Sequence, residues 1–235
     1  NIENIQKAFA KYVRIIPEDG LLVLNGDDSK CLELAKETNA KTLTYGITNK
    51  NTDFFAVNIA FDNDGFPEFD VYKEQKFYDR FKLYVPGLHN ILNALACISL
   101  CDSYGISNTT IKTALTKFRG ADRRFEYKGK VNGSSIFDDY GHHPTEILAT
   151  AKALMNKKYN KSWVVFQPHT YSRTANLLED FAHSLLNFDN IIVVDIYAAR
   201  EKNTYNISSK DLLDKLVSFG ANAKYIPEFN ETVEY

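Results

Sequence analysis

The densest group of chemically active side chains lies between Asp138 and Pro144, where the chain reads Asp-Asp-Tyr-Gly-His-His-Pro. Two carboxylates, a phenol and two imidazoles fall within six consecutive positions there. A short extended run, Ser134 to Phe137, precedes the group, and a helical pattern begins at Pro144. Open α/β sheets bind their ligands where the carboxyl end of a strand meets the amino end of a helix. The group is therefore a candidate ligand site.

Two further strand ends carry functional groups. The first set is Gln167, His169, Tyr171 and Arg173, and the second is Asp195, Tyr197, Arg200, Glu201 and Lys202. Four strands joined by helices predict a parallel sheet, and the carboxyl ends of parallel strands share one edge. A single polar turn is commonplace. Three in succession favour a site at which the sets converge.

Two other chemistries fit this group less well. His142 and His143 with Asp138 and Asp139 resemble metal ligands in type, but adjacent histidines on a turn point in different directions. No second His-x-His or Cys pair completes a ligand shell, so we predict no metal site. A hydrolytic triad would need a nucleophile turn, and no Gly-x-Ser-x-Gly occurs.

The signals for nucleotide binding are indirect. The sequence has neither a Gly-x-x-x-x-Gly-Lys-Ser/Thr loop nor a Gly-x-Gly-x-x-Gly motif. It does have Asn90 at the start of a helix, and an amide can hydrogen-bond an adenine edge. Arg123 and Arg124 could neutralise a phosphoryl group. A helix cap for Asn90 and a solvated charged pair for the arginines remain alternatives.

The elements that must position these residues form two regions, with a boundary between Phe118 and Asp122. For residues 1–118 we expect strands at Leu21–Asn25, Thr42–Tyr45, Phe55–Phe61, Phe69–Val71 and Phe81–Val85, a hairpin turn at Asn63–Gly65, and helices at Lys30–Glu37, Ile91–Asp102 and Ser107–Phe118. For residues 119–235 we expect strands at Ser134–Phe137, Trp163–Gln167, Ile191–Asp195 and Lys224–Ile226, with helices at Pro144–Met155, Arg173–Phe188 and Ser208–Phe219. Pro144 suits a first helical position, and Ser208 with Asp211 resembles a capping box. The predicted class is α/β: a Rossmann-like, mostly parallel sheet with flanking helices, preceded by an α/β region with a small antiparallel element.

Composition narrows the functional classes. The formal charge of −2 over 235 residues provides no basic face for nucleic acid. The longest apolar run, Ile91 to Leu100, is too short to span a bilayer. The three cysteines are expected to be free thiols, which favours the cytoplasm. The chain opens in a helical pattern without a cap or an initiator methionine, so we expect a piece of a longer protein.

These motifs together resemble the Mur ligases, ATP-dependent amide-forming enzymes of bacterial cell-wall synthesis. The resemblance covers essentially the whole chain, and the segments that carry it are Asn25–Asp28, Pro86–Ala94, Arg123–Glu126, Asp138–Glu146, Gln167–Thr174 and Asp195–Ala199. It implies that residues 1–118 are the latter part of a central ATP-binding domain. Residues 119–235 would then be most of a C-terminal Rossmann-like ligand-binding domain.

The resemblance also implies a nucleotide site. Asn90, with His89 nearby, would contact adenine, and Asp139 would hold the ribose hydroxyls. Arg124 would face the γ-phosphate and act as a catalytic residue. The cofactors implied are ATP and Mg²⁺, with the magnesium ligands mostly outside this chain.

The substrates implied are UDP-N-acetylmuramate and L-alanine, in the bacterial cytoplasm and without membrane insertion. ATP would phosphorylate the substrate carboxylate, and the amine of alanine would then attack the acyl phosphate. The pocket for the muramoyl carboxylate and the incoming alanine would be lined by Tyr140, His142 and Arg173. His142 and Arg173 would be catalytic. His143 and Asp138 would support the turn. Many members have arginine where this chain has Thr170, which leaves Arg173 as the only guanidinium of that motif.

Two other functions remain open. A ligase that recycles the murein tripeptide shares the ATP machinery, but its turn usually carries Phe-Ala where this chain has Tyr140-Gly141, and it lacks Gln167-Pro168-His169. A non-catalytic module that binds a nucleotide or an amino acid would account for the missing phosphate loop. We expect the 235 residues alone to have no ligase activity. The oligomeric state is left open.

Overall fold

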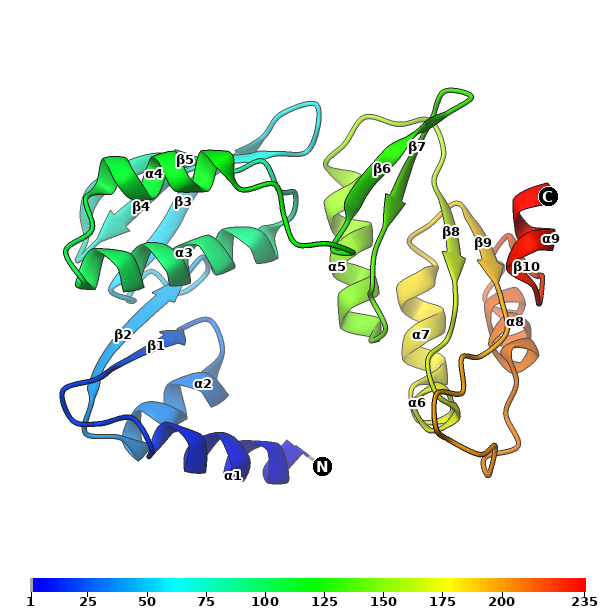
Figure 1. Ribbon diagram of the computed structural model, residues 1–235, viewed down its shortest axis with the longest axis horizontal. Helices are drawn as coiled ribbons and strands as arrows, with labels where there is room; N and C mark the ends of the chain where they lie inside the picture. Colours follow the sequence, from blue (N-terminus) through cyan, green and yellow to red (C-terminus); the bar gives the residue numbers. More distant parts are fainter. Residues whose placement is uncertain (1) are drawn as a thin grey trace. The chain divides into compact units, whose positions relative to one another are not determined.

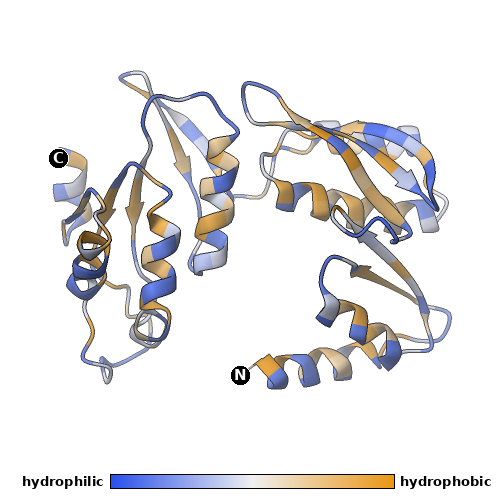
Figure 2. Cartoon of the chain, turned by 180° about the vertical axis from the view of Figure 1, so that it is seen from behind, coloured by the Kyte–Doolittle hydropathy of each residue, from blue (hydrophilic) through white to orange (hydrophobic). Residues whose placement is uncertain are grey.

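The chain folds into two compact units (Figure 1), one extending to Gly120 and the other from Ala121 to Tyr235. The computed structural model describes residues 2–235. Each unit is an α/β structure with its own apolar core. Several strands are largely hydrophobic, and several of the helices show one hydrophobic and one hydrophilic face (Figure 2). The α/β class predicted from the sequence is confirmed.

The first unit is built on a five-stranded mixed sheet in the order β1-β2-β3-β4-β5. Strands β1, β2 and β3 are parallel, and β3, β4 and β5 are antiparallel neighbours. The strands are β1 (Leu21–Asn25), β2 (Lys41–Gly46), β3 (Phe54–Phe61), β4 (Pro67–Lys73) and β5 (Lys76–Lys82). The helices are α1 (Ile2–Val13), α2 (Ser29–Glu33) with the 3₁₀ turn η1 (Leu34–Glu37), α3 (Leu88–Ser103) and α4 (Asn108–Lys117).

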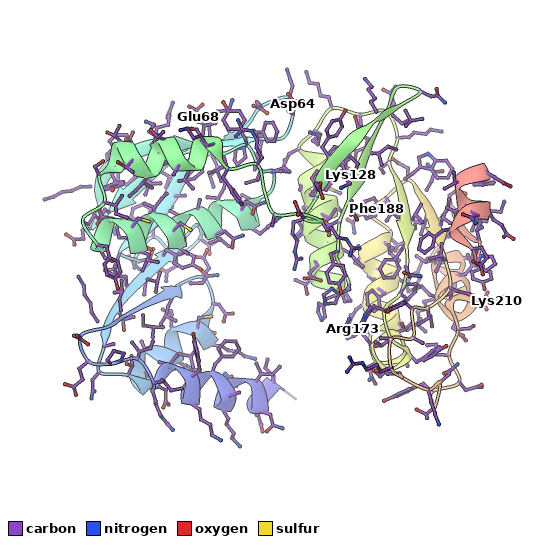
Figure 3. The ribbon with its side chains drawn as sticks, viewed as in Figure 1. Asp64, Glu68, Lys128, Arg173, Phe188 and Lys210 are labelled. Atoms are coloured by element: carbon purple, nitrogen blue, oxygen red, sulfur yellow. The ribbon has the colours of Figure 1, made fainter. Side chains whose placement is uncertain are left out.

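The sequence predicts one of the two hairpin turns of this sheet but not the other. The predicted turn at Asn63–Gly65 is confirmed: Asp62 accepts hydrogen bonds from the N–H groups of Asp64 and Phe66, and Asp64 lies at the tip (Figure 3). The expected strand Phe81–Val85 is wrong, because β5 begins earlier and pairs with β4 through a tight turn. That turn consists of Glu74 and Gln75, at φ 50° and 64°. Such turns usually contain Asn or Gly, so the sequence offers no signal for it.

Helix α3 closes the core of the first unit. Ile91, Leu95 and Ile98 are fully buried and pack in one cluster with phenylalanines of the sheet. The apolar run Ile91–Leu100 thus belongs to a core helix. Among the residues described, no helix is long and apolar enough to cross a membrane.

The second unit contains a parallel sheet of three strands, not the four predicted. The order β10-β9-β8 joins β8 (Trp163–Phe166), β9 (Asn190–Val193) and β10 (Ala223–Tyr225). The expected fourth strand is β7 (Ser134–Asp138), which instead pairs antiparallel with β6 (Glu126–Val131) as a separate hairpin. Their turn is Asn132-Gly133, at φ 48° and 88°. Asn-Gly is a strong hairpin signal. It indicates that β7 pairs with the strand before it and not with the parallel sheet.

Helices α5 (Pro144–Met155), α7 (Leu178–Leu185) and α8 (Ser209–Ser218) form one core with the parallel sheet. The second unit also contains α6 (Tyr171–Asn176) and α9 (Phe229–Glu234). The single helix expected over Arg173–Phe188 is wrong, because the chain breaks at Leu177, where φ is −122°. The break lets α7 turn Phe181 and Leu185 into the core, where both are fully buried.

A carboxylate fixes the loop after β2 in the first unit. Asp27 accepts hydrogen bonds from the N–H groups of Ile47 (2.8 Å), Thr48 (3.1 Å) and Asn49 (2.7 Å). Burial raises the pKa of Asp27, but these N–H groups outweigh burial and hold the pKa below the ordinary 3.8. The ionised carboxylate therefore stabilises the fold.

We predict that Asp27→Ala lowers the free energy of unfolding by about 1–3 kcal/mol, because it leaves three donors without their acceptor. The stabilisation is complete above the pKa of an unfolded aspartate and is lost as the pH falls through the lower folded value. Urea unfolding between pH 7 and pH 3 measures both effects. Asp19→Ala, at an exposed aspartate, is the control. Equal unfolding midpoints for the two variants at pH 7 would contradict the prediction.

Candidate active site

The Asp138–Pro144 segment forms the turn between β7 and α5, here called the β7–α5 turn. His143 is the N-cap residue of α5, and its ring nitrogen Nδ1 accepts a hydrogen bond from the N–H of Thr145. Pro144 occupies the start of the helix, and Glu146 completes a capping box. Asp138 forms an ion pair with Arg123 at 3.3 Å. The expectation that His143 and Asp138 support the turn is confirmed.

Asp139 lies inside this turn and ties three segments together. Its Oδ2 accepts hydrogen bonds from the Phe125 N–H (3.0 Å) and the Thr150 hydroxyl (2.9 Å), and its Oδ1 accepts one from the Gly141 N–H (2.7 Å). Oδ1 keeps a second lone pair for another donor. A Cβ on Gly141 would lie 2.9 Å from Oδ1. A larger residue at 141 would therefore require the Asp139 carboxylate to shift.

The two arginines before β6 are both ion-paired. Arg123 lies 4.7 Å above the Tyr140 ring in addition to its contact with Asp138. Arg124 donates from Nη1 to Glu146 at 3.1 Å. Each side chain remains more than half exposed, at 57% and 53%, so each keeps N–H groups that face solvent. Glu146 was not among the residues predicted from the sequence to form the site; the capping-box spacing was its only signal.

A chain of rings connects the β7–α5 turn with the segment after β8. The ring centres are 5.1 Å apart for Tyr140 and His142, 5.9 Å for His142 and His169, and 5.5 Å for His169 and Tyr197. The predicted convergence of the three polar sets thus occurs in part, although β7 is not in the parallel sheet. Arg173, on α6 (Figure 3), joins the group, with Nη1 3.3 Å from His169 Nδ1.

The protonation of His169 follows from its neighbours. Arginine can only donate, so Nδ1 of His169 must accept from Arg173. Burial, the charge of Arg173 and His142 together lower the pKa of His169, against a smaller opposing effect of Glu201. His169 is therefore neutral at pH 7, with its remaining proton on Nε2.

The segment that carries Arg173 is held in a strained conformation. Thr170 has φ 65°, a value that residues other than glycine rarely adopt. Its N–H donates to the Tyr197 carbonyl at 2.9 Å. Glu201 accepts hydrogen bonds from the N–H (2.8 Å) and the hydroxyl (2.5 Å) of Ser172. The strain at Thr170 is therefore offset by contacts with the segment that follows β9.

His89 and Asn90 lie in the first unit, at the start of α3. The Asn90 amide donates to the Pro86 carbonyl at 2.8 Å and lies 3.2 Å from His89 Nε2, while its Oδ1 accepts from Asn93 at 3.2 Å. One lone pair of Oδ1 remains for a ligand donor. Among residues 2–235, no group of three or more His, Cys, Asp or Glu is arranged to hold a metal ion.

We predict that Arg173→Ala raises the pKa of His169 toward its ordinary 6.5, because the variant removes a neighbouring positive charge. A pH titration of the histidine ring signals by NMR measures this shift. Arg200→Ala, at an exposed arginine, should leave the pKa unchanged. A His169 pKa that does not respond to Arg173→Ala would show that the charge of Arg173 does not contribute to its lowering.

Comparison with known proteins identifies the family to which the chain is related. Residues 1–101 match the Mur ligase middle domain, and residues 123–235 match the Mur ligase glutamate ligase domain. Over all 235 residues the chain is 46% identical to a UDP-N-acetylmuramate–L-alanine ligase of Clostridium novyi and 43% identical to one of Acetivibrio thermocellus. It covers 51% and 50% of these two proteins, so it spans about half their length.

A solved structure agrees with this match. The crystal structure of the UDP-N-acetylmuramate–alanine ligase MurC from Thermotoga maritima superposes on the whole chain with a TM-score of 0.79 at 28% identity. The chain covers 48% of that protein. The two domain matches and these relatives show that the chain belongs to the Mur ligase family.

Proposed function

We propose that this chain is part of an ATP-dependent ligase that joins L-alanine to the carboxylate of UDP-N-acetylmuramate. The observation that carries the proposal is the 43–46% identity, over every residue of the chain, to relatives named for that reaction. The polar side chains around the β7–α5 turn of the second unit support the proposal. Arg124, Tyr140, His142 and Arg173 have the charges and hydrogen-bonding groups that two anionic substrates and a phosphoryl group need.

The reaction proceeds in two steps. A carboxylate oxygen of the acyl substrate attacks the γ-phosphorus of ATP, and ADP leaves. The alanine amine, after losing a proton from its ammonium form, attacks the carbonyl carbon of the acyl phosphate. Inorganic phosphate then leaves with the oxygen that came from the carboxylate, and an amide remains.

Charged residues of the second unit suit the first step. Arg124 has exposed N–H groups that can bind a γ-phosphate and stabilise the charge that develops on it. Arg173 can hold a substrate carboxylate. Residues 2–235 contain no group of three or more His, Cys, Asp or Glu that could hold magnesium.

His142 suits the second step. Its Nδ1 lies 3.0 Å from the Tyr140 carbonyl, which can only accept, so Nδ1 carries the proton in the neutral ring. Nε2 is then left as an acceptor, able to take a proton from the attacking amine. The neutral His169 beside it carries its proton on Nε2 and can donate it to a substrate acceptor. The His142 and His169 rings are in contact, and His169 also contacts Arg173.

Asn90 in the first unit and Asp139 in the second each keep an unused acceptor. Asn90 keeps one lone pair on Oδ1 for the amino group of adenine, and Asp139 keeps one on its own Oδ1 for a ribose hydroxyl. We propose that Asn90, with His89 nearby, contacts adenine and that Asp139 holds the ribose hydroxyls. The bacterial cytoplasm is the proposed compartment, supported by the free thiols of Cys31, Cys97 and Cys101.

The test is a substrate comparison with the full-length protein that contains this chain. ADP release is measured with ATP, magnesium and UDP-N-acetylmuramate, and with either L-alanine or the murein tripeptide as the amine. We predict a kcat/KM at least about 100-fold higher for L-alanine, since a pocket built for one amine leaves polar groups unpaired with another. Preference for the tripeptide would identify the recycling ligase, and no ADP release with either amine would favour a binding module.

A further inference from the structure

We infer that Glu146 is a positioning residue that holds the Arg124 guanidinium and the backbone of the His142 turn in one arrangement. One carboxylate would then link the residue that stabilises phosphoryl transfer to the residues that receive the amine. This inference rests on the proposed function and deepens it.

The two oxygens of Glu146 divide the contacts between them. Oε1 accepts from Arg124 Nη1 at 3.1 Å. Oε2 accepts from the backbone N–H groups of His142 (2.9 Å) and His143 (3.2 Å) and lies 3.5 Å from His142 Nδ1. The carboxylate therefore fixes the start of α5 and the direction of Arg124 at the same time.

The charge on Glu146 is maintained at neutral pH. Burial raises the pKa of Glu146, but the His142 N–H and Arg124 outweigh it and the pKa is lowered. Arg124 needs such a partner, because an exposed arginine has many rotamers and must be ordered before it can stabilise a transition state. The nearby carboxylates have other partners: Asp138 pairs with Arg123, and Glu126 with Lys128.

Helix capping alone does not require this arginine. Helix α8 has an equivalent capping box in which Asp211 accepts from the N–H and hydroxyl of Ser208, both at 2.8 Å. No arginine or lysine forms an ion pair with Asp211 among the described residues. The same capping device thus occurs in this unit with and without a guanidinium. Asp211 is therefore a matched control for the structural part of the role of Glu146.

The experiment compares Glu146→Gln, Arg124→Ala, the double variant and Asp211→Asn in the full-length protein. Glutamine keeps an oxygen for the backbone N–H groups but removes the charge that holds Arg124. We expect kcat for L-alanine-dependent ADP release to fall about 10-fold or more in Glu146→Gln, with little change in Tm. Adding Glu146→Gln to Arg124→Ala should cause no further fall, because Glu146 acts through Arg124. Asp211→Asn should keep kcat within about twofold.

Three results would overturn the inference while the wild type remains active: kcat of Glu146→Gln within about twofold of the wild type, an equal loss in Asp211→Asn, or additive losses in the double variant. The first would show that the charge is unnecessary, the second that capping alone matters, and the third that Glu146 acts independently of Arg124. A wild type without alanine-dependent ADP release would overturn the proposed function itself. The two failures are thus distinguished by the activity of the wild type.

Discussion

Two carboxylates accept hydrogen bonds from backbone N–H groups in the β7–α5 turn and from one N–H group just before β6. Asp139 accepts from Phe125 and Gly141, and Glu146 accepts from His142 and His143. Buried or half-buried donors without acceptors are costly, so these contacts decide whether the turn forms. The positions of the rings and arginines of the candidate site depend on that turn. The residues that hold the turn therefore also position part of the candidate site.

The sequence predicted those elements whose signals are local. The capping box of α8 and the Asp62–Phe66 turn both depend on side chains within a few residues of their partners. The Asn132-Gly133 turn was equally local, yet its strand was assigned to the parallel sheet. The Glu74-Gln75 turn could not be predicted, because its positive φ values are imposed by strand pairing and not by residue type.

The candidate site was only partly predictable. His142, His169 and Arg173 were expected to meet at one sheet edge, and they do meet, although β7 lies outside that sheet. The contacts of Glu146 with Arg124 and of Glu201 with Ser172 join residues more than 20 positions apart. Such contacts depend on rotamers and on the folded backbone, which a sequence pattern does not specify.

We propose that the protein containing this chain activates a carboxylate as an acyl phosphate before forming the amide. It can be tested with UDP-N-acetylmuramate labelled with ¹⁸O in its carboxylate, incubated with ATP and L-alanine. Each phosphate released should carry one ¹⁸O, because the carboxylate oxygen that attacked phosphorus leaves with it. Mass spectrometry of the phosphate measures the label. Amide formation accompanied by unlabelled phosphate would contradict the account.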